Sequence, residues 1–188
     1  MSTFIKYITV IATSLLVSMP ARGQMSELPP GAVKHENEDL LMIVMTRTPE
    51  QLNAFYTGRG FNRTSIDALT ERCFVFGMVE NKTQERLWLI LDDWQFIDAE
   101  GNVIRRYTRD DWKQTWKDTG LEQAKQSTFG WTQLPEVRDL HRHEHVGGQV
   151  ALPWQDQPFR LVATFHSGID KDGKPHTVSF EDLECRKQ

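Results

Sequence analysis

The sequence lacks the motifs that mark several common classes of enzyme. It contains no Gly-rich phosphate loop, no nucleophile elbow and no dinucleotide-binding fingerprint. Its two cysteines do not form a Cys-x-x-Cys pair, which argues against a thioredoxin-like redox role. These absences favour a protein that is not an enzyme, and we expect no catalytic residue.

Basic residues are also too few for some partners. The chain has 22 Lys and Arg residues against 26 Asp and Glu residues, which gives a formal net charge of −4. Proteins that bind nucleic acid need a basic face to neutralise phosphates. We therefore expect neither nucleic acid nor an anionic membrane surface as the partner.

Long apolar runs are absent except near the start of the chain. Lys6 precedes apolar and small residues over positions 7–19, a run shorter than the roughly 20 residues that span a bilayer, so we expect no permanent membrane span. Ala21 and Gly23 suit the −3 and −1 positions of a signal peptidase site. The sequence predicts a cleavable signal peptide over residues 1–23 and a periplasmic or secreted mature protein. A retained N-terminal anchor is the alternative.

The two cysteines are Cys73 and Cys185. An even number of cysteines in an exported chain predicts one disulfide. In the chain-entropy model, this bond would stabilise the folded state by on the order of 4–5 kcal/mol, because it closes a loop in the unfolded chain. Two unpaired buried thiols are the alternative.

After the signal, the sequence indicates a leader and one domain. Residues 24–38 are polar and contain Pro29-Pro30-Gly31, which predicts a flexible leader, so residues 39–188 form the single domain. Within it, Thr48-Pro49-Glu50-Gln51 is typical of a helix start with a capping box. We expect helical insertions at about residues 48–70 and 109–124.

Most of the remaining pattern alternates with period two and is rich in β-forming residues. Turn-forming residues at 98–102 and 170–174 separate these runs. Residues 127–134 also favour an extended segment. The fold class that this pattern predicts is mainly β, an antiparallel β-sandwich with short helical insertions. The expected strands are residues 40–44, 73–79, 87–91, 94–97, 103–107, 149–152, 159–165 and 176–180.

Two stretches resemble a known family. Residues 76–83 and 96–102 are similar to the "G-x-V-x-N-x-T", strand, "D-x-x-G" pattern of bacterial exported immunoglobulin-like domains of the FxLYD type. The resemblance covers about residues 72–180, and the "L-P-x-G-E" segment of that family has no close counterpart here. It implies an immunoglobulin-like sandwich. Because such domains are mostly binding or accessory modules of unknown role, it carries over no catalytic residue.

A run of histidines supplies the most unusual local chemistry. On a strand, His141, His143 and His145 would share one face and lie close enough to hold a metal. Neutral imidazole suits Cu(II) and Zn(II), so a copper or zinc site is one interpretation. A solvated polar loop before Gly147-Gly148 is the other.

The same run fits the spacing H-x-x-E-H at His141, Glu144 and His145. On a helix over residues 135–145, this spacing would give two zinc ligands with Glu144 as general base of a hydrolase. Such an enzyme needs a third protein ligand, which the sequence does not identify. A zinc-dependent hydrolase is therefore the third hypothesis.

Six tryptophans are many for a chain of this length. They indicate either core packing or an aromatic binding surface. Trp112 and Trp116, four residues apart on the expected helix and near Arg109, are the best candidates for an exposed patch. Since Trp and Arg are typical of interface hot spots, the leading hypothesis is a non-enzymatic binding or accessory domain for a protein partner.

Overall fold

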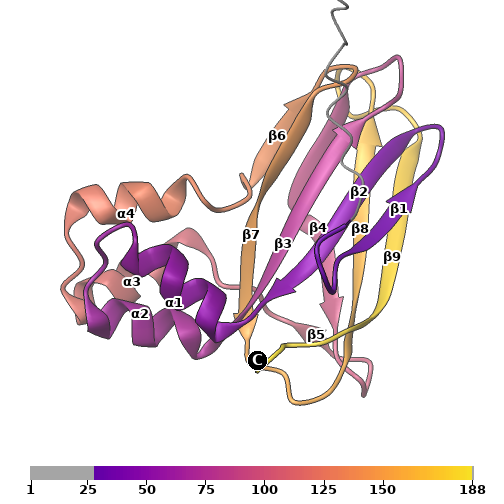
Figure 1. Cartoon of the computed structure of the whole chain (residues 1–188). Coiled ribbons are helices and arrows are strands. Elements are labelled where there is room, and N and C mark those ends of the chain that lie inside the picture. Colours follow the sequence, from indigo (N-terminus) through magenta and orange to yellow (C-terminus); the bar gives the residue numbers. More distant parts are fainter. Residues whose placement is uncertain (1–27, 188) are drawn as a thin grey trace, which may run out of the picture.

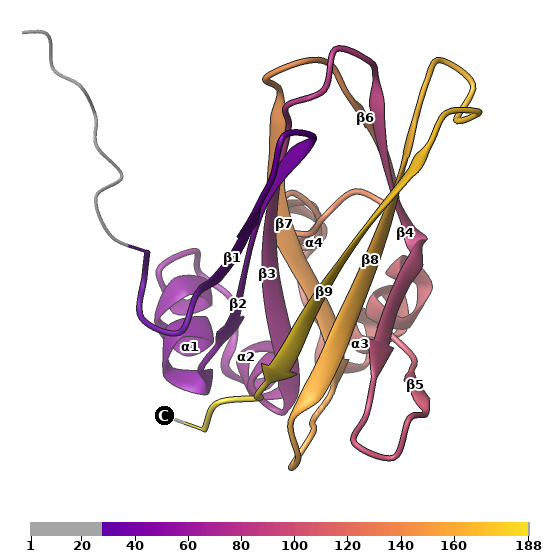
Figure 2. The ribbon, with the colours of Figure 1, turned by 90° about the vertical axis from the view of Figure 1, so that its right-hand side faces the viewer.

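In the computed structural model, which describes residues 28–187, two antiparallel β-sheets pack face to face and four short helices form a lobe beside them (Figure 1). The elements in chain order are β1 (Val33–Glu36), β2 (Leu40–Arg47), α1 (Pro49–Thr57), α2 (Arg63–Thr70), β3 (Arg72–Asn81), β4 (Leu87–Ile97), β5 (Val103–Ile104), α3 (Arg109–Thr119), α4 (Gln123–Gly130), β6 (Val137–Leu140), β7 (His145–Pro153), β8 (Phe159–Ser167) and β9 (Pro175–Leu183). The first sheet has the strand order β1-β2-β3-β7, and the second has the order β5-β4-β8-β9 with β6 also paired to β4 (Figure 2). The predicted fold class, mainly β with two antiparallel sheets, is confirmed.

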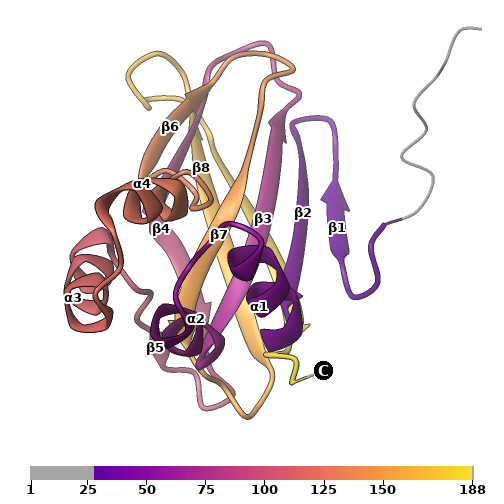
Figure 3. The ribbon, with the colours of Figure 1, turned by 60° about the vertical axis from the view of Figure 1, so that its left-hand side comes forward.

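Strand β3 is buried on both faces at its start, which explains its continuous apolar run. Cys73 and Val75 point into the sandwich core, whereas Phe74 packs in the core of the helical lobe. Because successive strand residues point to opposite faces, one strand serves both cores. Its neighbour β7 is shared in the same way, with Val150 in the sandwich core and Ala151 in the lobe. The helices therefore cover part of the outer face of the first sheet (Figure 3).

A β-bulge in β4 changes which residues of this strand face the core. Leu89 and Leu91 occupy the inner face before the bulge, and Trp94 and Phe96 occupy it afterwards. The pairing with β8 shifts between Leu89 and Trp94. An odd number of extra residues in one strand reverses the inward and outward alternation beyond it. The acidic pair at 92–93 lies within this shift.

Strand β1 lies inside the segment predicted to be a flexible leader, residues 24–38. It pairs with β2 along the edge of the first sheet. Hydrogen bonds from Lys34 and Lys82 to the Glu36 carboxylate lower the pKa of Glu36 to about 2. The ordered domain thus begins before residue 39, because a short polar edge strand looks like a leader in sequence.

Helices α1 and α2 confirm the helical insertion expected at about residues 48–70. Thr48 Oγ1 accepts a hydrogen bond from the Gln51 N–H (3.3 Å), and Gln51 Oε1 accepts one from the Thr48 N–H (3.2 Å). This is the predicted capping box, with Pro49 at the first helical position. Asn62 caps α2 by accepting from the Ser65 N–H (2.8 Å).

The helix predicted over residues 109–124 is divided into α3 and α4. Gly120 ends α3 in the left-handed conformation (φ 67°), which glycine adopts without steric cost. The extended segment predicted over residues 127–134 is wrong, because α4 continues to Gly130. Glu122 caps α4 without a side-chain hydrogen bond, so the sequence offers no clear start signal for this helix.

The predicted disulfide between Cys73 and Cys185 is present. It joins β3 of the first sheet to the segment that follows β9 of the second sheet, across a sequence separation of 112. The bond therefore clamps the two layers of the sandwich at one end.

The predicted signal peptide, residues 1–23, lies outside the described residues. Within residues 28–187, no helix is long and apolar enough to cross a membrane.

Candidate binding groove

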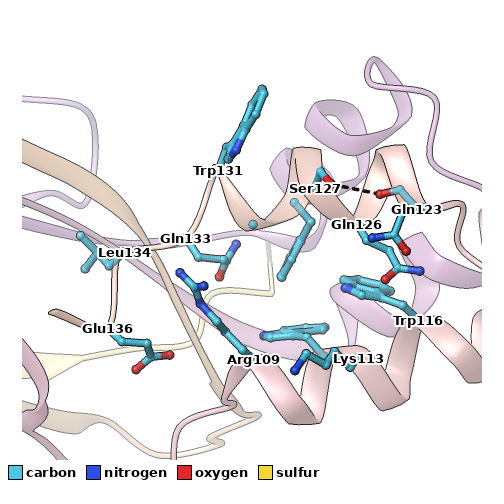
Figure 4. A pocket seen from close by; sticks show the side chains of 13 residues that line it. Arg109, Lys113, Trp116, Gln123, Gln126, Ser127, Trp131, Gln133, Leu134 and Glu136 are labelled. Carbon is cyan, nitrogen blue, oxygen red and sulfur yellow. Dashed lines mark hydrogen bonds between the residues drawn. The ribbon is translucent and has the colours of Figure 1, made fainter. Parts of the chain in front are cut away.

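Helices α3 and α4 and the segment 131–136 surround a groove with a volume of about 430 Å³ (Figure 4). Aromatic side chains form its floor, and amide, hydroxyl and charged side chains form its walls. The lining residues are Arg109, Trp112, Lys113, Trp116, Gln123, Gln126, Ser127, Phe129, Gly130, Trp131, Gln133, Leu134 and Glu136.

Stacked tryptophans form the floor of the groove. The rings of Trp112 and Trp116 are nearly parallel, with an interplanar angle of 19° and centroids 5.0 Å apart. Phe129 of α4 packs against both, with centroid distances of 4.7 and 4.8 Å. Residues four apart on a helix share one face, which places both indoles toward α4.

These tryptophans do not form the exposed patch that the sequence predicts. Trp112 is 5% exposed and Trp116 is 3% exposed, because both rings belong to the core of the helical lobe. The expectation of an exposed Trp112 and Trp116 surface is therefore wrong. Arg109, one turn before Trp112, is exposed and lines the groove.

Capping interactions fix the start of α3 and hence the position of its lining residues. Thr108 Oγ1 accepts from the Asp111 N–H (3.4 Å), and Asp111 Oδ2 accepts from the Thr108 N–H (2.7 Å). Arg105 adds an ion pair to the Asp111 carboxylate (2.9 Å). Partial burial opposes ionisation of Asp111, but the hydrogen bonds from Thr108 and Arg105 outweigh it and lower the pKa of Asp111.

Residues 132–134 form the groove wall opposite α3 and are hydrogen-bonded to strand β7. The Gln149 N–H donates to the Thr132 carbonyl (2.9 Å), and the Leu134 N–H donates to the Gln149 carbonyl (3.0 Å). Gly148 allows this close approach, since a Cβ there would lie 2.6 Å from the Gln133 carbonyl carbon and closer still to the Leu134 nitrogen. The segment is thus held as a short parallel extension of the first sheet.

A buried tyrosine, Tyr56, contacts the same wall from the interior of the lobe. The Tyr56 hydroxyl hydrogen-bonds to Thr132 Oγ1 (2.9 Å), and its ring packs 5.9 Å from Phe129. Burial raises the pKa of Tyr56 to about 12, so this hydroxyl stays protonated at neutral pH. Tyr56 is therefore a structural group of the lobe.

Some charged side chains around the groove form ion pairs with described residues, and one does not. Arg106 binds the Glu136 carboxylate with both terminal nitrogens, so this acid of the wall already has a partner. Lys113 pairs with Asp110 (2.7 Å) on the exposed face of α3. Arg109 forms no ion pair with a described residue, and its guanidinium points toward Gln133 across the groove (Figure 4).

Trp131 is the most exposed aromatic side chain of the groove. It is 88% exposed and extends away from the other lining side chains (Figure 4). Sequence reasoning missed Trp131 as a site residue, because a tryptophan beside Gly130 carries no pattern that separates an exposed ring from a buried one. The number of tryptophans was the one signal that pointed to an aromatic surface.

The histidine run forms neither a continuous strand nor a helix, and most of it is the exposed polar loop that was the alternative to a metal site. Residues 137–140 form β6, residues 141–144 form a turn in which His143 has φ 63°, and β7 begins at His145. The helix expected over residues 135–145 for a zinc hydrolase is therefore wrong. The imidazoles of His141, His143 and His145 are exposed, and the described part of the chain contains no group of three or more metal-binding side chains that could hold an ion.

Two other histidines pair singly with carboxylates on the sandwich. His166 of β8 lies 2.9 Å from Asp93 at the β4 bulge, and His176 of β9 lies 3.1 Å from Asp39 in the β1–β2 turn. Each pair joins two segments that are distant in sequence. Neither pair lines the groove.

No protein-family model and no curated protein matches this chain. Among solved structures, the yjhA protein from Bacillus subtilis is similar over 81% of this chain and 96% of that chain, with 10% sequence identity and a TM-score of 0.42. A likeness at this level carries no argument about function.

Proposed function

We propose that this chain is an exported, non-enzymatic binding or accessory domain, and that its groove receives a segment of a partner protein. One observation carries the proposal: Trp131 is 88% exposed at a groove whose floor is aromatic. Exposed apolar surface beside a concave site is typical of interaction sites, and Trp is enriched among the residues that dominate binding energy.

The size of the groove favours a segment over a broad flat interface. Its volume of about 430 Å³ falls within the range of roughly 300–1,000 Å³ that is usual for small-ligand pockets. A few consecutive side chains of an extended peptide fill such a space. Burial of Trp131 beneath that peptide would remove a large apolar area from water.

The Cys73–Cys185 disulfide supports export to the periplasm or outside the cell, since such bonds persist in oxidising compartments. Two antiparallel sheets packed face to face support an immunoglobulin-like sandwich like that of FxLYD-type domains.

Site-specific photo-crosslinking tests the proposed function in the cells that produce this protein. A photoreactive phenylalanine analogue at Trp131 should give one adduct of defined mass. The same analogue at Ile169, which is 73% exposed near the turn between β8 and β9, serves as the matched control and should not give it. Identical adducts from both positions would contradict a specific groove.

The affinity of variants for the captured partner then measures how much the Trp131 ring contributes to binding. We expect Trp131→Ala to weaken binding by roughly 30-fold, which corresponds to a hot spot of about 2 kcal/mol. Ile169→Ala should leave the affinity unchanged. Because both side chains are exposed, neither substitution should alter the fold.

A further inference from the structure

Arg109, a cation at the edge of the groove, indicates which kind of segment the groove would bind. Arg109 is exposed, lines the groove and forms no ion pair with a described residue. The neighbouring acids are engaged elsewhere: Asp110 with Lys113, Asp111 with Arg105, and Glu136 with Arg106. The guanidinium of Arg109 is therefore available to an acceptor that a ligand supplies.

The walls on either side of Arg109 suit a peptide backbone. Gln123 and Ser127 lie on the α4 side, and Gln133 lies on the opposite wall (Figure 4). Gln133 Nε2 donates to Thr132 Oγ1, and its Oε1 can accept a hydrogen bond from a ligand N–H. Side-chain amides can pair with both the N–H and the C=O of an extended chain.

We propose, on the basis of the proposed function, that the partner segment is an acidic peptide that presents a carboxylate to Arg109 and an apolar or aromatic side chain to Trp131. Arg is the side chain that binds a carboxylate in bidentate geometry, and a charge-assisted hydrogen bond is stronger than a neutral one. Arg109 thus selects the charge of the segment, while Trp131 supplies apolar area.

A phage-displayed library of random heptapeptides, selected on the purified chain, tests this inference. The selected peptides should contain both Asp or Glu and an aromatic or aliphatic residue. Arg109→Gln should weaken the best peptide about tenfold, and replacing its acid by the corresponding amide should do the same. The two changes together should cost little more than either alone, because both remove one interaction.

Charge reversal and a matched control sharpen the experiment. Arg109→Glu should select basic peptides instead of acidic ones. Arg142→Gln, an exposed change in the β6–β7 turn and outside the groove lining, should leave peptide binding unchanged. Circular dichroism of each variant verifies that the fold is intact.

The outcomes separate this inference from the proposed function. Peptides that depend on Trp131 but lack an acid and ignore Arg109→Gln would overturn the acidic-segment inference alone. Failure to select any peptide that depends on Trp131 would overturn both proposals. Binding of a neutral oligosaccharide that Trp131→Ala abolishes would also overturn both and make the groove a sugar site.

Discussion

The sandwich and the helical lobe are built from different kinds of core. Mostly aliphatic side chains from both sheets fill the sandwich, and the Cys73–Cys185 disulfide clamps one end of it. Aromatic side chains dominate the lobe, where Phe129 packs against both Tyr56 and Trp112. The sandwich is thus a scaffold fixed by strand alternation, whereas the lobe is fixed by the contacts of a few large rings.

The candidate site therefore lies in the helical lobe, the region whose stability depends more on contacts with the rest of the molecule. The four helices are 8–11 residues long, and isolated helices of this length are marginal in water. The lobe depends on docking against the first sheet through Phe74 of β3 and Ala151 of β7. We therefore expect the sandwich to hold its structure without an intact lobe, but the lobe to fail when the sandwich unfolds.

The largest expected effect comes from loss of the disulfide. A cross-link over a sequence separation of 112 stabilises by about 4–5 kcal/mol in the chain-entropy model, so Cys73→Ser with Cys185→Ser should lower the Tm by roughly 10–20 °C. Thermal melts followed by far-UV and near-UV circular dichroism measure it. Both signals should shift together, and an unchanged Tm in the double variant would contradict a structural role for the bond.

Removal of one large ring should separate the two regions. Trp116→Ala should destabilise the lobe by about 3–5 kcal/mol, because it leaves a cavity beside Trp112 and Phe129. Hydrogen exchange should accelerate at residues 109–130 while residues 159–167 of β8 keep their protection. Uniform loss of protection in both segments would show that the lobe and the sandwich form one cooperative unit.

Two adjacent glycines offer a matched test of how the groove wall joins the sandwich. Gly148→Ala should cost about 1–3 kcal/mol and weaken ligand binding, because its Cβ would displace the backbone at 133–134. Gly147→Ala places its Cβ 3.4 Å from the Phe76 ring and should change little. Chemical denaturation of both variants measures the difference. Equal stabilities would contradict the tight approach of this wall to β7.

The smallest expected effect concerns the edge of the sandwich. Hydrogen bonds and ion pairing from Lys34 and Lys82 lower the pKa of Glu36 to about 2. Because the folded-state pKa lies below the ordinary value of 4.5, this carboxylate stabilises β1 above pH 4.5, and the contribution disappears as the pH falls toward 2. NMR titration of Glu36 measures the pKa directly. A titration midpoint near 4.5 would contradict the pairing, and Glu36→Gln should remove this part of the acid dependence.

The sandwich could be predicted from the sequence because its strands follow local rules. Alternation identified the strands other than β1 and β6, turn residues located the hairpin at 170–174, and the capping box at Thr48 marked the start of α1. The β4 bulge was also visible in principle, as the shift from an odd to an even apolar register between Leu91 and Trp94. These features depend on neighbours in the chain.

The site could be predicted only in part, because tertiary contacts determine which rings are exposed. The sequence identified Arg109, Trp112 and Trp116 as one helical group, but the packing of Phe129 against the two indoles buries them. Trp131 is exposed at the position just after α4 ends, and α4 itself lacks a strong apolar stripe. Where local patterns are weak, only the assembled lobe shows which side chain faces a ligand.

The measurement that tests the central claim most directly is fluorine NMR of the chain labelled with 5-fluorotryptophan, with the Trp131 resonance assigned by Trp131→Phe. When an acidic peptide selected on the wild-type chain is added, the Trp131 resonance should shift with the largest amplitude. The resonances of Trp94, in the sandwich core, and Trp154, outside the groove, should remain in place. Shifts at Trp154 or Trp88 with an unchanged Trp131 would contradict the account, because the ligand would then bind away from the groove.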